Sequence, residues 1–109
     1  MGMPTYRTYS NSMKYNFDWD PDKEKLNKEK HGVSFEDAAT VFCDPQAFTI
    51  FDPDHSQSEN RWITLGISQK GKLLVTCHTY KTENGEGVIR IFSSRKATKS
   101  EKKQYGEMT

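Results

Sequence analysis

The chain has 109 residues, of which 33% are hydrophobic and 28% are charged, and its formal net charge is +1. This length fits one domain with a modest core. The sequence has no apolar run of the ~20 residues that a membrane span needs and no signal-peptide pattern, so we expect a cytoplasmic protein with no membrane partner. Cys43 and Cys77 lie in apolar surroundings without paired spacing, which indicates buried, reduced thiols.

The charge is divided unevenly along the chain. Residues 1–60 contain six Lys/Arg and eleven Asp/Glu, a net charge of −5, whereas residues 61–109 contain ten and four, a net charge of +6. This asymmetry indicates either an internal electrostatic match or a surface that attracts phosphate, and attraction of nucleic acid is its commonest functional use. A solvated basic face without a partner is an equal alternative at this point.

The first half of the chain reads as a strand followed by two helices. Residues 1–12 show no periodicity, and we interpret them as a leader ahead of a folded domain at 13–109. Alternation of aromatic and polar residues predicts a strand at 15–19. Asp20 and Pro21 are typical of a helix start, and that helix should end at about His31, before Gly32. Ser34 is the predicted N-cap of a second helix that ends before residues 44–45.

After residue 45 the periodicity changes from helical to alternating. Strands are predicted at residues 46–52, 61–68, 72–80 and 88–94, with a tight turn at Gly71 and a looser one at 82–87. Thr98 and Glu101 form a capping box, so a short helix should run from 98 to about 105. The predicted fold class is α+β: an antiparallel sheet of about four to five strands, two N-terminal helices and a short C-terminal helix.

Side-chain alternation predicts one exposed face of mixed aromatic and cationic character. If Ile89 and Ile91 face the core, residues 90, 92 and 94 point outward. The same rule, with Leu73, Val75 and Cys77 inward, turns residues 76, 78 and 80 outward. The expected face carries Trp62, His78, Tyr80, Arg90 and Phe92, bordered by Arg61, Arg95 and Lys96. This mixture suits single-stranded RNA, whose bases stack on aromatic rings while its phosphates pair with Arg and Lys.

Four segments, at residues 17–42, 52–66, 73–79 and 89–105, resemble the BrnT toxins of bacterial type II toxin–antitoxin systems. The motifs are Lys-His-Gly with Val-Ser-Phe-Glu-Asp-Ala, then Asp-Pro-Asp-His-Ser, Ile-Arg-Ile and Ser-x-Arg-Lys-Ala, in this order. The resemblance implies a RelE-like fold, a ribonuclease that arrests growth by cutting RNA, and neutralisation by a BrnA-type antitoxin in a hetero-oligomer. It also implies that operator DNA is bound only through the toxin–antitoxin complex. Residues 1–12 lie outside the resemblance.

A compatible mechanism is metal-free cleavage, in which the 2′-hydroxyl of RNA attacks the adjacent phosphate. That reaction needs a base, cations for the phosphorane and an acid for the leaving oxygen. His78 is the candidate for proton transfer. The candidates for phosphate contact are Arg61, Arg90, Arg95 and Lys96, and those for base stacking are Trp62, Tyr80 and Phe92. A structural histidine held by hydrogen bonds is an alternative reading of His78.

The remaining candidates favour structural roles. His31 should stabilise the C-terminal end of the first helix. His55 is expected in a turn, although its place in the family motif makes it a candidate for a functional contact. Cys77 and His78 are adjacent and point to opposite faces, and no other spacing suggests metal ligands, so we expect no metal and no other cofactor. The alternative function is a non-catalytic module that binds nucleic acid or an acidic protein through the same basic face.

Overall fold

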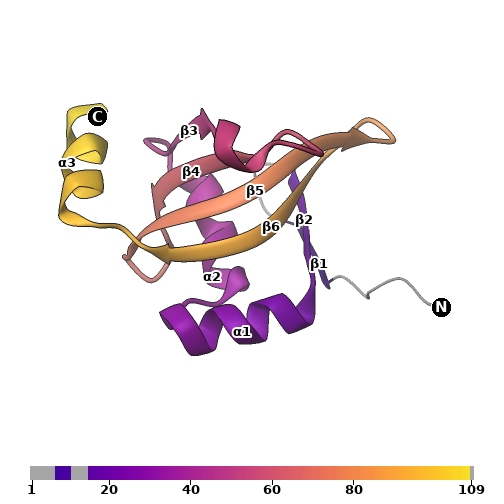
Figure 1. Ribbon diagram of the computed structural model, residues 1–109, viewed down its shortest axis with the longest axis horizontal. Coiled ribbons are helices and arrows are strands. Elements are labelled where there is room, and N and C mark those ends of the chain that lie inside the picture. The colour runs from indigo at the N-terminus through magenta and orange to yellow at the C-terminus, as the bar shows by residue number, and fades with distance from the viewer. Residues whose placement is uncertain (1–6, 11–14, 109) are drawn as a thin grey trace.

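The computed structural model describes residues 7–10 and 15–108, which form a six-stranded sheet flanked by helices (Figure 1). The strands are β1 Arg7–Ser10, β2 Tyr15–Trp19, β3 Phe48–Phe51, β4 Trp62–Ile67, β5 Leu73–Glu83 and β6 Glu86–Lys96. The helices are α1 Pro21–His31, α2 Phe35–Ala39 and α3 Lys99–Met108, with 3-10 helices η1 Thr40–Cys43 and η2 Pro53–His55. Among these residues, no helix has the length and apolar character needed to cross a membrane.

The sheet is mixed, with strand order β1-β2-β6-β5-β4-β3. β2 runs parallel to β6, and the other neighbouring strands are antiparallel. The predicted antiparallel meander therefore describes β3 to β6 but is wrong for the whole sheet. Residues 7–10, expected in a leader, form β1 and pair with β2, which otherwise would be an exposed edge. Residues 1–6 and 11–12 of that expected leader lie outside the described residues.

Local capping signals set the ends of the helices as predicted. The Asp20 side chain accepts a hydrogen bond from the N–H of Asp22, and α1 ends at Gly32, which has a left-handed φ of 69°. The Ser34 hydroxyl accepts from the N–H of Asp37 and begins α2. α2 then tightens into η1 at Thr40, whose hydroxyl donates to the carbonyl of Asp37. The second predicted helix is thus one α-helical segment followed by a 3-10 segment.

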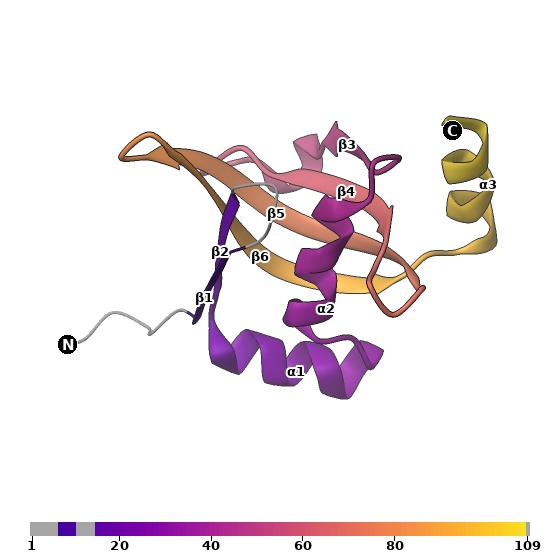
Figure 2. The ribbon, with the colours of Figure 1, turned by 180° about the vertical axis from the view of Figure 1, so that it is seen from behind.

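α2 covers one face of the sheet, as the view from behind shows (Figure 2). We call this the helical face and the opposite one the open face, because no described helix crosses the β4–β6 strands on the side turned to the viewer in Figure 1. Aromatic and aliphatic side chains of β2, α2 and β6 form the core on the helical face. They are Phe17, Trp19, Phe35, Ala38, Ala39, Ile89 and Ile91. Ile89 and Ile91 therefore face the core, as predicted.

The predicted inward face of β5 is wrong. Leu74 and Thr76 are fully buried and His78 is 3% exposed, so these residues, and not Leu73, Val75 and Cys77, lie on the helical face. The alternation of apolar and polar residues predicted the wrong face because the helical face contains buried polar side chains that hydrogen-bond to one another. Thr76 and Ser94 hydroxyls are 3.0 Å apart, and Thr64 Oγ1 is 2.7 Å from His78 Nε2.

A β-bulge between β5 and β6 alters the alternation. Cys77 lies opposite Ser93 and His78 opposite Ile91, so Phe92 has no partner across the ladder. Ser94, predicted to point outward, is fully buried as a result. Its N–H donates to Asn27 Oδ1, and Asn27 Nδ2 donates to its carbonyl. These two hydrogen bonds attach α1 to β6 next to the bulge.

Two connections complete the fold. The turn between β5 and β6 consists of Asn84 and Gly85, both with positive φ (53° and 81°), so the loose loop expected at 82–87 is a tight hairpin and both strands are longer than predicted. The capping box of α3 is confirmed. Thr98 N–H donates to Glu101 Oε1 at 2.8 Å, and Glu101 N–H donates to Thr98 Oγ1 at 3.2 Å.

Candidate active site

A groove of about 470 Å³ crosses the open face of the sheet. α1 and η2 contribute to its two sides, which lie below and above the strands in Figure 1, and β4, β5 and β6 contribute its floor. We call it the cationic groove, after the charged and imidazole side chains of its lining: Lys23, Lys30, His31, Asp52, His55, Arg61 and Arg95. It combines phosphate-binding side chains with two imidazoles, a composition suited to chemistry on RNA.

His55 is oriented in this groove by Asp52. Asp52 is the N-cap of η2, and its Oδ2 lies 2.7 Å from His55 Nδ1. The Asp52 side chain is 8% exposed and that of His55 is 65% exposed, so a buried carboxylate supports an accessible imidazole. With the carboxylate as acceptor, Nδ1 carries the proton and Nε2 is the basic nitrogen. This arrangement can exchange a proton with a ligand in the groove.

Arg61 and Phe92 form the centre of the groove floor. The guanidinium carbon of Arg61 lies 4.1 Å from the Phe92 ring centroid, and Lys23 Nζ lies 5.1 Å from the same ring. The bulge at Phe92 presents this ring to both cations. Arg61 also lies 3.8 Å from Glu59, while its buried Nε has no hydrogen-bond partner within the described part of the chain. Arg61 therefore keeps donor capacity beside the floor of the groove.

The other predicted cations form closer contacts with a carboxylate or lie outside the groove. Arg95 makes a two-point contact with Glu101, at 2.8 and 2.9 Å, and this hydrogen bonding raises the pKa of Arg95 and lowers that of Glu101 to about 2. Arg90 donates to Asp18 at 3.2 Å and does not line the groove. Lys96 is exposed at the end of β6, also outside the groove lining. Of the predicted phosphate ligands, Arg61 and Arg95 thus lie together, with Phe92 beside them.

His78 does not lie with these arginines. It is buried on the helical face, where Nε2 is 2.7 Å from Thr64 Oγ1 and Nδ1 is 3.2 Å from the carbonyl of Thr79. Burial lowers its pKa to about 4. The expectation that His78 is exposed is therefore wrong. Trp62 and Tyr80, predicted to share a face with His78, do line a pocket with it, but on the side opposite to the cationic groove.

The cationic groove lies within the part of the chain that matches a known family. A family model described as the ribonuclease toxin, BrnT, of type II toxin–antitoxin systems matches residues 19–101. The chain belongs to the BrnT family. As a member, it is a ribonuclease toxin with an antitoxin partner, and every residue that lines the groove falls inside the matched range. A search of curated proteins found no match.

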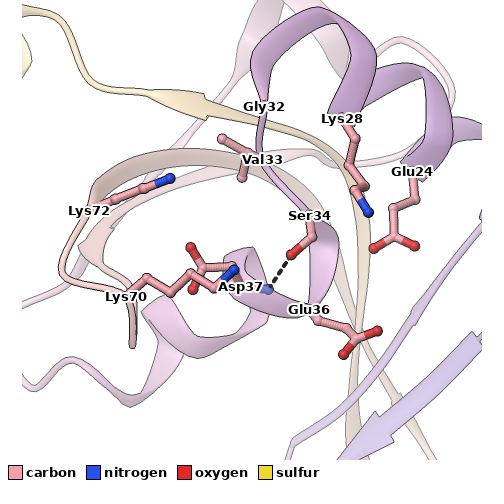
Figure 3. Close-up of a pocket in the computed structure, with 9 residues that line it drawn as sticks. All are labelled: Glu24, Lys28, Gly32, Val33, Ser34, Glu36, Asp37, Lys70 and Lys72. Atoms are coloured by element: carbon pink, nitrogen blue, oxygen red, sulfur yellow. Dashed lines mark hydrogen bonds between the residues drawn. The ribbon is translucent and has the colours of Figure 1, made fainter.

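A further pocket of this BrnT chain lies between α1, α2 and the β4–β5 hairpin (Figure 3). Three acidic and three basic side chains point into or along it from these elements: Glu24, Glu36, Asp37, Lys28, Lys70 and Lys72. It has neither an aromatic ring nor a histidine in its lining. The balanced charge and the lack of an imidazole make it a poorer site for RNA chemistry than the cationic groove.

Both cysteines are free, as expected, but Cys43 is exposed and not buried. Cys77 is part of the groove floor, and burial, reinforced by the negative charge of Asp52, raises the pKa of its thiol. No group of three or more His, Cys, Asp or Glu side chains in residues 7–10 and 15–108 is placed to hold a metal ion.

Sequence reasoning missed Asp52, the two groove lysines and the position of His55. A signal was present in Asp-Pro-Asp-His, because side chains three residues apart lie on the same side of a 3-10 turn. A carboxylate at 52 and an imidazole at 55 therefore meet. Lys23 and Lys30 are seven residues apart in α1, so both face the same side of that helix.

Proposed function

We propose that this BrnT-family chain cleaves RNA in the cationic groove without a metal ion. The observation that carries the proposal is the exposed His55, held by the buried Asp52 in the same groove as Arg61, Lys23 and Lys30. A general base and a group of cations are the two components that 2′-hydroxyl attack on a phosphate needs most. We further propose that this cleavage inhibits translation and that a BrnA-type antitoxin neutralises it.

In the proposed reaction, His55 Nε2 removes the proton of the 2′-hydroxyl. The O2′–P bond forms and the P–O5′ bond breaks, giving a 2′,3′-cyclic phosphate and a 5′-hydroxyl. Arg61, Lys23 and Lys30 stabilise the additional negative charge of the phosphorane. His31, the other imidazole of the groove, supplies the proton that the leaving O5′ takes up. Arg95 adds positive charge from its place beside Glu101.

The proton-transfer role thus passes from His78 to His55. A catalytic base has to reach its proton, and His78 is 3% exposed, with both ring nitrogens in contact with protein groups. Its lowered pKa also makes it a weak base at neutral pH. We propose that His78 supports the sheet, that Arg61 keeps the phosphate-binding role predicted for it, and that Arg95 contributes positive charge from its pair with Glu101.

The test is cleavage of end-labelled RNA by the purified chain in excess EDTA. His55→Gln should reduce the rate at least about 100-fold, since a general base contributes 10²- to 10⁴-fold. Asp52→Asn should also reduce it, because the orienting carboxylate is lost. Lys70→Ala is the matched control, an exposed lysine away from the groove, and should cleave at the wild-type rate. Products should end in a 2′,3′-cyclic phosphate.

Two results would contradict the proposal: wild-type cleavage by His55→Gln, or loss of wild-type cleavage on addition of EDTA. A non-catalytic nucleic-acid-binding module is the second candidate function. The observation that favours it is that Arg61, Arg90 and Arg95 each already lie beside a carboxylate. Stable binding of RNA by the wild-type chain without any cleavage would decide for that module.

A further inference from the structure

Another cavity, of about 430 Å³, lies on the helical face and is lined by residues of η1 and of the strands. Rings dominate its lining: Tyr15, Phe42, Trp62, His78 and Tyr80, joined by Thr49, Asn60 and Ile89. We call it the aromatic pocket. It shares no lining residue with the cationic groove, and the sheet separates the two.

The aromatic pocket is electrically neutral. Among the described residues that line it, none is an acid, a lysine or an arginine, and burial keeps the His78 imidazole uncharged at neutral pH. Tyr80 is 49% exposed, so much of its surface is available to a ligand. Such a lining disfavours a phosphate and favours a flat, uncharged group that stacks on aromatic rings.

The rings are held in place before any ligand arrives. Tyr15 and Tyr80 meet edge to face, with centroids 6.1 Å apart, and Phe42 contacts both Tyr15 and His78 in the same manner. Gly87 permits this arrangement, because a Cβ there would lie 3.0 Å from the Tyr80 ring and 3.1 Å from the Tyr15 ring. A preformed site loses less side-chain entropy on binding.

Polar groups of fixed direction stand among the rings. His78 Nδ1 donates to the Thr79 carbonyl, so Nε2 accepts from the Thr64 hydroxyl, which in turn accepts from Thr49 Oγ1 at 2.7 Å. The single hydroxyl proton of Thr49 is therefore used, and Thr49 offers only acceptor capacity to a ligand. The Asn60 amide can both donate and accept. A ring with an N–H or amino group on its edge satisfies both.

We propose that the aromatic pocket binds one nucleobase of the RNA strand whose phosphates occupy the cationic groove. Arg61 immediately precedes β4 and Trp62 is its first residue, with Arg61 in the groove and Trp62 in the pocket. A strand that passes around this end of β4 places a phosphate beside Arg61 and the adjoining base beside Trp62. The inference rests on the proposed function, in that RNA is the ligand, and it makes the pocket a determinant of base preference.

The test compares two short single-stranded DNA probes of equal length, one with all its bases and one with an abasic sugar at every position. The wild type should bind the base-bearing probe about 10-fold more tightly, since stacking of one base contributes 1–3 kcal/mol. Tyr80→Ala should remove this preference without lowering the affinity for the abasic probe. Tyr80→Phe should keep it. Arg61→Ala should lower the affinity for both probes. Ile50→Ala, an exposed apolar control, should change neither affinity.

Equal affinity of the wild type for both probes, or an unchanged preference in Tyr80→Ala, would overturn the inference. So would a Tyr80→Ala variant that binds both probes normally but no longer co-purifies with the antitoxin, because the pocket would then belong to a protein partner. DNA lacks the 2′-hydroxyl, so this experiment is independent of cleavage. A base preference in a chain that does not cleave RNA would overturn the proposed function alone.

Discussion

Arg61, Arg90 and Arg95 each lie beside a carboxylate, but the three contacts differ in strength. Arg61 is 3.8 Å from Glu59, whereas Arg95 holds Glu101 through two hydrogen bonds below 3 Å. A loose, partly exposed ion pair contributes about 0–1 kcal/mol, so a phosphate can displace Glu59 at little cost. The two-point Arg95 contact resists displacement. Arg61 is therefore the arginine more available to a substrate.

This difference predicts opposite phenotypes for two arginine variants. Arg61→Ala should reduce RNA cleavage by about 100-fold, because a cation beside the reacting phosphate is lost, and its thermal transition should stay near that of the wild type. Arg95→Ala should lower the free energy of unfolding by about 1–2 kcal/mol, because Glu101 loses its charged partner. Thermal and urea denaturation alongside the cleavage assay measure both. A stable but inactive Arg95→Ala would assign the phosphate contact to Arg95 instead.

His78 should make the stability of the domain dependent on pH. Its pKa is lowered from 6.5 to about 4 in the folded state, so the unfolded chain takes up a proton first as the pH falls. The stabilising effect of the neutral imidazole is complete above pH 6.5 and is lost as the pH falls towards 4. Between pH 7 and pH 5 this corresponds to about 2 kcal/mol.

Urea unfolding of the wild type and of His78→Gln at pH 7 and pH 5 measures that effect. The variant keeps a polar side chain but has no group that titrates in this range, so its loss of stability on acidification should be smaller by about that amount. The other two histidines and the carboxylates are the same in both proteins and cancel in the comparison. Identical pH dependence of the two proteins would show that His78 has the same pKa in the folded and the unfolded chain.

At the scale of elements, α3 lies beyond one end of the sheet and is held there by polar contacts (Figure 1). Glu101 near its start binds Arg95, and the Tyr105 hydroxyl donates to Asp44 Oδ2 at 2.6 Å. Burial and this hydrogen bond raise the pKa of Tyr105 to about 12. Partial burial tends to raise the pKa of Asp44, but hydrogen bonds from the Ile67 N–H and from Tyr105 outweigh it and lower that pKa.

Glu101→Gln should therefore loosen α3 as a unit. The substitution weakens both the capping box and the ion pair to Arg95, and we expect a loss of about 1–2 kcal/mol. Because the pKa of Glu101 is lowered from 4.5 to about 2, its contribution in the wild type is complete above pH 4.5 and is lost as the pH falls towards 2. Faster amide exchange confined to α3, with the sheet unchanged, is the expected signature.

Glu107→Gln supplies the control for this prediction, since Glu107 is an exposed acid in the same helix. Amide exchange of α3 in Glu107→Gln should match that of the wild type. If Glu101→Gln left the exchange of α3 unaltered, the helix would be held mainly by Tyr105 and Asp44, and Tyr105→Phe would then show the larger effect.

At the scale of the whole molecule, the features predictable from the sequence are those set by neighbouring residues. The ends of α1, the cap at Ser34 and the box of α3 depend on groups two to four residues apart, and all were predicted correctly. The parallel pairing of β2 with β6 joins residues such as Phe17 and Ile89, which no local pattern connects. The sequence therefore predicts the individual helices and strands better than it predicts which strands pair with each other.

The candidate site shows the same limit. Arg61, Phe92 and Arg95 were predicted together and line one groove, and Trp62, His78 and Tyr80 were predicted together and line one pocket. The prediction was wrong in placing both groups on the same face of the sheet. The bulge at Phe92 and the buried polar side chains of β4 and β5 both offset the simple alternation of strand residues. Neither has a clear signature in a single sequence.

The uneven charge of the chain bears on its antitoxin. A segment that silences the toxin has to cover the site where RNA binds. Six of the ten Lys/Arg side chains of residues 61–109 lie at Arg61 in the cationic groove, at the corner formed by Arg95 and Lys96, or in α3. We predict that a BrnA-type antitoxin covers this open side with an acidic segment. Aromatic rings and arginines favour the centre of such interfaces, and Phe92 with Arg61 provides both.

Attraction between opposite charges should speed the encounter of toxin and antitoxin more than it strengthens the complex. The association rate should therefore fall steeply between low salt and 1 M salt, where the screening length shortens to about 3 Å, while dissociation changes little. Co-expression with the neighbouring reading frame, stopped-flow mixing and hydrogen exchange of the free and bound toxin test this. Protection should appear over β6 and α3. If it appeared only over α2 and η1, on the helical face, the antitoxin would act from the opposite side of the sheet, and the positive charge would serve RNA alone.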